Sequence, residues 1–197
     1  MSTPNPALAR PGVPTHRTLV SGSLNFGAVS PILRTLLTTD GTVTEVLSAY
    51  FGEEIRVQVL AQGYRAYEGR FNLELEAEVG VRMLDRRITL VGVESGTIYA
   101  AAESRIVPGL LPPGMQEALL AEREPLGKLM LDYRLETFRE IVAAGACRAG
   151  DAPHLKGHCG PALALGDDAI VVWRTYRVIS QGQPIMSITE AFSEGLE

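Results

Sequence analysis

The pattern of hydrophobic and polar residues changes its period once in the first third of the chain. Over residues 30–52 the apolar side chains recur about every 3.6 residues, as on one face of a helix. From Ile55 to Val59 they alternate with polar ones, as in a half-buried strand. Alternation returns on both sides of two short turns, which predicts two antiparallel hairpins: residues 79–93 with 97–107, and residues 170–180 with 183–192.

The helical segment near the N-terminus contains two start signals and one stop signal. Ser30 followed by Pro31 predicts the first helix, because serine caps helix N-termini and proline fits the first helical turn. Thr42 and Glu45 have the spacing of a capping box, so a second helix is expected to start there and to end near Gly52. The two helices would form an αα-hairpin.

Two later segments are harder to assign. Residues 134–142 continue a helical spacing of apolar residues that begins at Leu126, but the surrounding hairpins would accept a strand equally well. Residues 145–168 are rich in Gly, Ala and Pro, so we expect a loop. Together with a helix expected at residues 112–122, the order of elements indicates an α+β fold with an antiparallel sheet covered on one face.

Composition and charge narrow the class of protein. The chain has 197 residues, of which 46% are hydrophobic and 21% charged, and this suits one folded domain with a full core. Four of the twelve prolines lie within residues 1–14, so we expect a flexible arm over residues 1–20 and a single domain over residues 21–197. The net charge of −5 argues against a general nucleic-acid binder.

Further features concern the location and the partners of the protein. The chain contains no apolar stretch of about 18 residues and no signal-peptide pattern, so we expect a cytoplasmic protein without a membrane span. Two cysteines do not make a disulfide framework in a chain of this size. The expected partner is a small-molecule substrate, and the expected assembly is a monomer or a homodimer.

Two charged residues interrupt the apolar faces of predicted strands. Arg86 projects between Leu84 and Ile88, and Glu190 lies on the same side of its strand as Ile188. One explanation is a buried Arg86–Glu190 ion pair, which adds little net stability but is costly to break. The other is a closed cavity, in which Arg86 binds a carboxylate and Glu190 faces the far end of the ligand.

Other candidate residues carry weaker signals. Arg82 lies one pleat repeat from Arg86, where it would contact a second anion or be solvated. Four side chains of zinc-ligand type lie within residues 147–159, but their spacing matches no standard zinc motif, so we expect no metal: Cys147, His154, His158 and Cys159. Nucleophile elbows, phosphate-binding glycine loops and dinucleotide fingerprints are absent, so covalent hydrolase, kinase and nicotinamide chemistry are unsupported.

Five motifs, in their order along the chain, resemble those of the chorismate pyruvate-lyases. The resemblance covers about residues 35–192. It is greatest to the actinobacterial branch that makes 4-hydroxybenzoate for phenolic lipids, including Tyr176-Arg177-Val178-Ile179-Ser180. The five motifs are Asp40-Gly41-Thr42-Val43-Thr44, Arg82-Met83-Leu84-Asp85-Arg86, Ala102-Glu103-Ser104-Arg105-Ile106-Val107-Pro108, Glu124-Pro125-Leu126-Gly127 and Gly182-Gln183-Pro184-Ile185-Met186-Ser187-Ile188-Thr189-Glu190.

This resemblance implies a fold and a site. The fold is an antiparallel sheet with helices on one face and helix-turn-helix flaps over a buried cavity, with residues 134–142 as a strand. By resemblance, Arg86 holds the ring carboxylate of the substrate and Glu190 lies at the 4-hydroxyl, and both are catalytic. Leu126 and Gly127 contact the ligand through their backbone, and Val43 is a flap residue over the ring.

The resemblance leaves the second arginine of the site undecided. It aligns with either Ser104 or Arg105, and a one-residue slip in a strand moves a side chain to the opposite face. We take Arg105 as the expected substrate-binding residue, with Arg82 as another contact for the second carboxylate. Val43 stands where the best-known relative has a longer methionine, which would widen the flap.

The implied activity is elimination of pyruvate from chorismate to give 4-hydroxybenzoate, without a metal or an organic cofactor. Glu190 is then expected to help transfer the proton at C4 or to polarise the 4-hydroxyl. Two alternatives stay open. One is a non-catalytic domain of the same fold that binds aromatic acids, as in some transcription regulators. The other is a divergent enzyme that acts on another cyclic or polyketide-derived intermediate.

Overall fold

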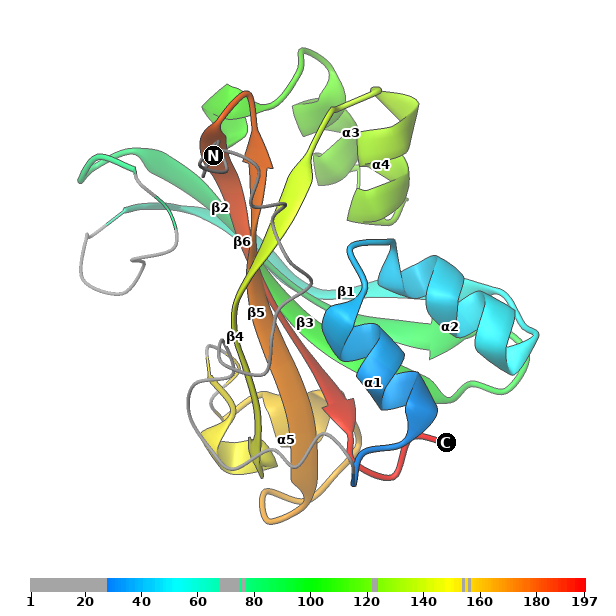
Figure 1. The fold of residues 1–197 in the computed structure, drawn as a ribbon. Coiled ribbons are helices and arrows are strands. Elements are labelled where there is room, and N and C mark those ends of the chain that lie inside the picture. Colours follow the sequence, from blue (N-terminus) through cyan, green and yellow to red (C-terminus); the bar gives the residue numbers. More distant parts are fainter. Residues whose placement is uncertain (1–27, 68–74, 76, 122–123, 154, 156) are drawn as a thin grey trace, which may run out of the picture.

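A six-stranded antiparallel sheet forms the centre of the computed structural model, which describes residues 28–67, 75, 77–121, 124–153, 155 and 157–197 (Figure 1). The strands are adjacent in the order β1-β2-β3-β6-β5-β4. The arm expected at residues 1–20 lies outside the described residues. The strand bounds are Ile55–Ala66 (β1), Arg82–Gly92 (β2), Ile98–Ile106 (β3), Phe138–Arg148 (β4), Ile170–Ser180 (β5) and Gln183–Ser193 (β6). The α+β class and both predicted hairpins are confirmed.

Two helical pairs pack on one face of this sheet. The helices are α1 (Pro31–Thr38), α2 (Val43–Phe51), α3 (Met115–Leu120), α4 (Leu126–Asp132) and α5 (Cys159–Ala162), and two 3-10 turns cover Pro108–Leu110 (η1) and Ala149–Asp151 (η2). In Figure 1, α1 and α2 lie at one end of the sheet, and α3 and α4 lie at the other. The predicted helix at residues 112–122 is present as the shorter α3.

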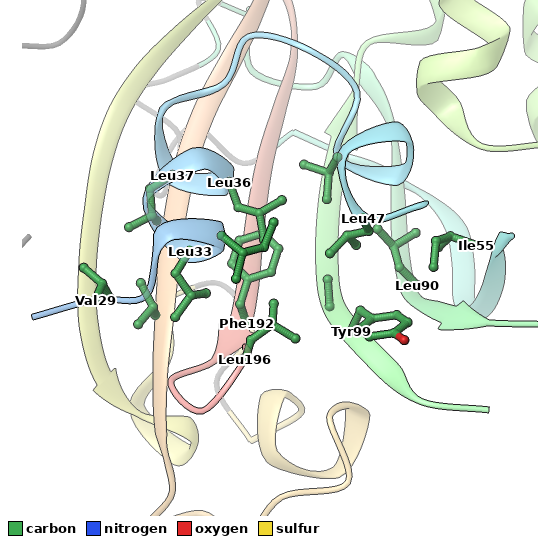
Figure 2. Packing of buried hydrophobic residues seen from close by; sticks show 14 of the residues in the cluster. Val29, Leu33, Leu36, Leu37, Leu47, Ile55, Leu90, Tyr99, Phe192 and Leu196 are labelled. Atoms are coloured by element: carbon green, nitrogen blue, oxygen red, sulfur yellow. The ribbon is translucent and has the colours of Figure 1, made fainter. Parts of the chain in front are cut away.

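The helix α1 begins and packs as its sequence predicts. Ser30 caps it, because its Oγ accepts a hydrogen bond from the backbone N–H of Leu33 at 3.4 Å. Its buried leucines pack against Phe192 and other residues of the sheet (Figure 2). Burial of each such leucine contributes about 1.5–3 kcal/mol relative to an exposed position. This packing anchors the helical pair α1–α2, which we call the flap, to the sheet.

The second helix departs from the prediction at its start. Thr42 is the N-cap of α2, but its side chain makes no capping hydrogen bond, so the predicted capping box with Glu45 is wrong. Its side chain lies against Gly127 of α4 instead. The predicted stop is confirmed, because Gly52 has a φ of 71°, in the left-handed region that glycine adopts without strain.

The segment that the sequence left ambiguous contains both a helix and a strand. The helical spacing from Leu126 belongs to α4, whereas β4 begins at Phe138, as the resemblance implied. Residues 145–148, expected in a loop, continue β4, and the short helix α5 follows later in the predicted loop. This helix packs on the other face of the sheet, against Trp173 and Ala191.

Candidate active site

A cavity lies on the face of the sheet that carries the flap. It is lined by the N-terminal part of α2, by α4 and by residues from all six strands, of which β1, β4 and β5 contribute one residue each. Most of the lining side chains are apolar, so a ligand there would be removed from water. The lining residues are Thr42, Val43, Thr44, Val57, Arg86, Ile88, Leu90, Ala100, Ala102, Ser104, Pro125, Leu126, Gly127, Met130, Arg139, Tyr176, Ile188 and Glu190.

Five of the residues singled out in the sequence line this one cavity. Arg86 enters from β2 and Glu190 from β6, and they are only 2% and 7% exposed. Val43 lines it from the flap, and Leu126 and Gly127 line it from the start of α4. The structure therefore brings together both charged residues that interrupt the apolar strand faces.

Arg105 and Arg82 lie outside the cavity. The register of β2 and β3 places Arg86 opposite Ser104, so Ser104 lines the cavity and Arg105 faces the other side of the sheet. There Arg105 forms an ion pair with Glu103 at 3.2 Å. Arg82 is exposed and lies over the ring of Tyr64, 3.6 Å from its centroid. Ser104 therefore replaces these two arginines in the candidate site.

Glu190 is held by two side chains from β5. Nε of Arg174 donates a hydrogen bond to Oε2 of Glu190 at 2.8 Å, and the hydroxyl of Tyr176 donates to Oε1 at 3.1 Å. The ion pair of Glu190 is thus with Arg174, which replaces the Arg86–Glu190 pair considered from the sequence. Both carboxylate oxygens have a donor, so the orientation of the carboxylate is fixed.

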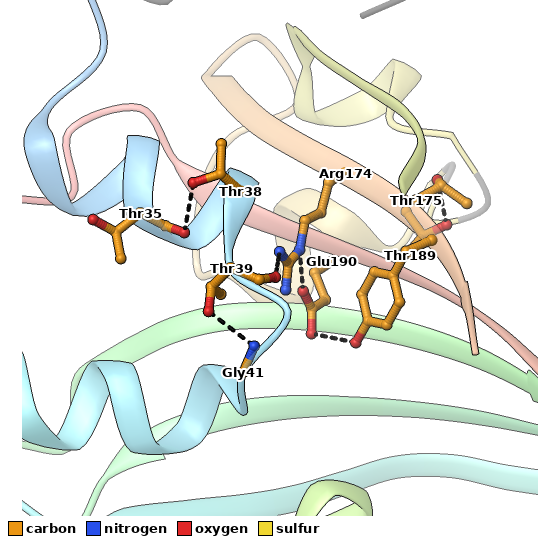
Figure 3. A network of polar contacts seen from close by, with 9 residues as sticks. Thr35, Thr38, Thr39, Gly41, Arg174, Thr175, Thr189 and Glu190 are labelled. Carbon is orange, nitrogen blue, oxygen red and sulfur yellow. Dashed lines mark hydrogen bonds and ion pairs between the residues drawn. The ribbon is translucent and has the colours of Figure 1, made fainter. Parts of the chain in front are cut away.

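Arg174 also connects this network to the flap. Its side chain is 1% exposed, and Nη1 donates to the backbone oxygen of Thr39, just after α1, at 2.7 Å (Figure 3). Burial opposes the charge of Arg174, but the carboxylate of Glu190 attracts it, and the pKa of the guanidinium is raised. Burial, followed by the charge of Glu190, raises the pKa of Tyr176, so its hydroxyl remains a donor.

Sequence reasoning missed Arg174 and Arg139. Arg174 carries the same signal as Arg86, because it lies between Val172 and Tyr176 on one side of its strand. Arg139 lines the cavity from β4. The apolar spacing of this segment fits a helix, so the sequence did not indicate on which face of a strand Arg139 lies. Its guanidinium carbon is 6.0 Å from the centroid of the Tyr176 ring.

The flap approaches α4 closely at one point. A Cβ atom at residue 127 would lie 2.7 Å from Cγ2 of Thr42 and 3.1 Å from its Oγ1. Only glycine therefore permits this contact without a shift of Thr42, and the contact lies at the edge of the cavity. The resemblance implied that Gly127 contacts the ligand through its backbone. The close approach of Thr42 is a second, steric reason for glycine at this position.

The candidate zinc ligands do not form a site among the described residues. In the described part of the chain, no three or more His, Cys, Asp or Glu side chains gather as metal ligands would. His154 lies outside the described residues. Cys159 is buried, and burial together with the nearby Cys147 raises the pKa of its thiol to about 12. It is therefore a neutral thiol at physiological pH.

Within the described residues, no helix is long and apolar enough to cross a membrane. The longest helix there, α2, has nine residues.

The fold is similar to that of solved regulator domains. The effector domain of PhnF from Mycobacterium smegmatis superposes with a TM-score of 0.61 at 14% identity, covering 78% of this chain and 88% of that one. A transcriptional regulator of the GntR family from Bacillus cereus gives a TM-score of 0.55 at 9% identity, covering 73% and 94% of the two chains. At these identities the likeness concerns the fold alone.

Sequence relatives point to one family. A chorismate pyruvate-lyase from Mycobacterium leprae is 35% identical over 164 residues, which are 81% of this chain and 73% of the relative. One from Mycobacterium tuberculosis is 36% identical over 166 residues, which are 81% and 78% of the two chains. The family described as "Chorismate pyruvate-lyase Rv2949c-like" matches residues 37–197. The chain therefore belongs to the Rv2949c-like chorismate pyruvate-lyase family.

Proposed function

We propose that this protein eliminates pyruvate from chorismate to give 4-hydroxybenzoate, without a metal or an organic cofactor. The observation that carries the proposal is the burial of an arginine and a carboxylate, Arg86 and Glu190, in the same apolar cavity. Family membership supports the reaction class, and the cavity supports the roles of individual residues.

The reaction itself requires only binding, orientation and movement of a proton. The ether bond at C3 breaks, C4 loses its hydrogen as a proton, and the electrons of that C–H bond complete the aromatic ring. The enolpyruvate that leaves gains a proton at its methylene carbon and becomes pyruvate. All atoms of chorismate reappear in the two products and no external oxidant is consumed, so the chemistry calls for no cofactor.

Arg86 is assigned to the ring carboxylate of the substrate. A guanidinium binds a carboxylate through two parallel hydrogen bonds, and this geometry orients the ligand as well as holding it. Ile88 and Leu90 line the cavity next to Arg86 on β2, and Ile188 lines it from β6. Such apolar walls exclude water and strengthen the charged interaction.

Glu190 is assigned to the opposite end of the ring, at C4 and its hydroxyl. Arg174 and Tyr176 each donate to one of its oxygens, so the carboxylate is presented to the ligand in one orientation. Remaining lone pairs of the carboxylate are available to accept the hydrogen bond of the 4-hydroxyl or the proton from C4. Arg174 is in this account a positioning residue that acts through Glu190.

We expect the flap to close over the bound substrate. Val43 lines the cavity from α2, and Leu126 lines it from α4, close to the contact between Thr42 and Gly127. Closure keeps water from the reacting atoms. An enclosed aromatic product leaves only when the flap opens, so we expect product release to be slow relative to the chemical step.

The experiment is turnover of chorismate by the purified protein. We expect 4-hydroxybenzoate, identified by NMR, and an equal amount of pyruvate, at a rate that chelators of divalent metals do not change. Glu190→Gln should still bind the product but lose most of the turnover, and full activity of this variant would remove Glu190 from the mechanism.

Two other outcomes would replace the proposal. A folded protein that binds 4-hydroxybenzoate without turning over chorismate would be a binding domain, like the regulator domains that share its fold. A folded protein that neither turns over nor binds these compounds would indicate another cyclic substrate.

A further inference from the structure

The substrate named in the proposed function carries two carboxylates, and the site described so far accounts for one. Arg86 is assigned to the ring carboxylate. The second carboxylate, on the enolpyruvyl group, also enters an apolar cavity, where an unpaired anion is costly. The sequence-based candidates for this role, Arg105 and Arg82, lie outside the cavity. Among the described residues that line it, Arg86 and Arg139 are the basic ones.

Arg139 has the environment of an anion-binding side chain. Its Nε is buried and has no hydrogen-bond partner among the described residues, and the guanidinium makes no ion pair with any of them. The two other arginines nearby on this part of the sheet are paired, Arg174 with Glu190 and Arg177 with Glu140. A guanidinium with a buried donor and no carboxylate, at the wall of a cavity, points to an anionic ligand.

Strand register places Arg139 at the opposite end of the cavity from Arg86. The row of direct cross-strand neighbours that starts at Arg86 continues with Ser104 on β3, Ile188 on β6 and Tyr176 on β5. Arg139 lies on β4, opposite Val178, which is one pleat repeat beyond Tyr176. Both arginines line the same cavity, so they approach a ligand from its two ends. Glu190, bound by Tyr176, lies between them in the strand order.

We propose that Arg139 binds the carboxylate of the enolpyruvyl group and so selects a substrate with two carboxylates. This inference rests on the proposed function. After the C3–O bond breaks, that carboxylate leaves with pyruvate. Arg139 therefore contributes to binding of chorismate but not of 4-hydroxybenzoate, whereas Arg86 contributes to both.

The test compares ligands with one and two carboxylates. The probes are 4-hydroxybenzoate and its non-reacting analogue 3-(carboxymethoxy)-4-hydroxybenzoate, whose binding is measured by calorimetry, together with the KM for chorismate. Arg139→Gln should weaken the dicarboxylate and raise the KM by about tenfold to a hundredfold, the usual loss for a charged hydrogen-bonded pair. Its affinity for 4-hydroxybenzoate should stay within about twofold of that of the parent protein.

Two further variants complete the design. Arg139→Lys keeps the charge without the planar fork, so the loss for the dicarboxylate should be smaller than in Arg139→Gln. It also replaces Arg139→Gln if that variant does not fold. Arg148→Gln is the matched control on the same strand, because Arg148 is 66% exposed and pairs with Asp168 at the surface. It should change none of the three values.

The outcomes separate this inference from the proposed function. Equal loss of affinity for both probes, or loss for neither, would overturn the role of Arg139. If the parent protein fails to turn over chorismate, the lyase assignment fails. In that case a selective loss for the dicarboxylate in Arg139→Gln still supports the inference, and its absence refutes it.

Discussion

Residues of the same type have different environments on the two faces of the central sheet. Arg86 and Arg87 are neighbours on β2, but Arg86 is buried at the cavity, whereas Arg87 is partly exposed on the opposite side. On that opposite side Arg105 pairs with Glu103, and α5 packs over Trp173. The comparison shows that the type of residue says little about function until its strand face is known.

The free energies involved explain why the difference matters. On the outer face the charges of Arg105 and Glu103 compensate each other within the protein, so this pair needs no ligand. A buried pair such as Arg174–Glu190 rarely adds net stability over an apolar replacement, yet it costs about 3–5 kcal/mol to break. The cavity differs from the outer face because its charged side chains line a space that a ligand can occupy.

The largest effect on stability is expected at Arg174. Arg174→Gln leaves the buried carboxylate of Glu190 without its cation and should lower the free energy of unfolding by about 3–5 kcal/mol. Denaturation by urea measures this loss. The double variant Arg174→Gln with Glu190→Gln should recover much of it, because no uncompensated charge remains. A double variant as unstable as the sum of the single ones would contradict the pairing.

The contact between the flap and α4 should affect activity more than stability. In Gly127→Ala the new methyl group displaces Thr42, so kcat/KM for chorismate should fall while helix propensity gains about 0.5–1 kcal/mol. Adding Thr42→Ser removes the methyl group that the new Cβ would meet and should restore much of kcat/KM. Unchanged kcat/KM in Gly127→Ala would show that the contact does not shape the site.

A carboxylate outside the cavity, on Glu53, should dominate the pH dependence of stability in acid. Hydrogen bonds from the hydroxyl of Tyr99, then from Ser95 and the backbone of Glu94, lower the pKa of Glu53 from 4.5 to about 2. The lowered value means that these bonds stabilise the fold fully above pH 4.5 and lose their effect as the pH falls towards 2. In Glu53→Gln the melting temperature should vary less with pH across this window. A pH dependence equal to that of the parent protein would contradict the assignment.

The smallest effect on turnover is expected on the outer face of the sheet. Arg105→Gln breaks an ion pair that lies outside the cavity and whose side chains are only 13% and 12% exposed, so the free energy of unfolding should fall by about 1–3 kcal/mol. The kinetic constants for chorismate should stay at the parent values. A strong loss of activity in this variant would mean that the cavity face has been assigned wrongly.

Much of the fold was predictable because its signals are local. Alternation and short turns identify both hairpins, and Ser30 with Gly52 marks the ends of the flap helices. β4 was not predictable from spacing, because the helical pattern of α4 runs into it along the chain. The capping box failed for a related reason, since Thr42 packs against Gly127 from a distant segment.

The candidate site was predictable where a charge interrupts an apolar strand face, as at Arg86 and Glu190. The same signal at Arg174 was present in the sequence and was overlooked. The sequence could not decide whether Ser104 or Arg105 faces the cavity, because a shift of one residue reverses the face and only the pairing with the neighbouring strands fixes the register. Arg139 required the knowledge that its segment is a strand, which no local pattern supplied.

The most direct test of the difference between the faces uses the adjacent arginines of β2. The measurement is kcat/KM for chorismate in the parent protein, Arg86→Ala and Arg87→Ala, with both variants checked for folding. Arg86→Ala should lower kcat/KM by about a hundredfold or more, because it removes a desolvated carboxylate contact. Arg87→Ala should leave it within about twofold. Equal losses in the two variants, or full activity in Arg86→Ala, would contradict the account.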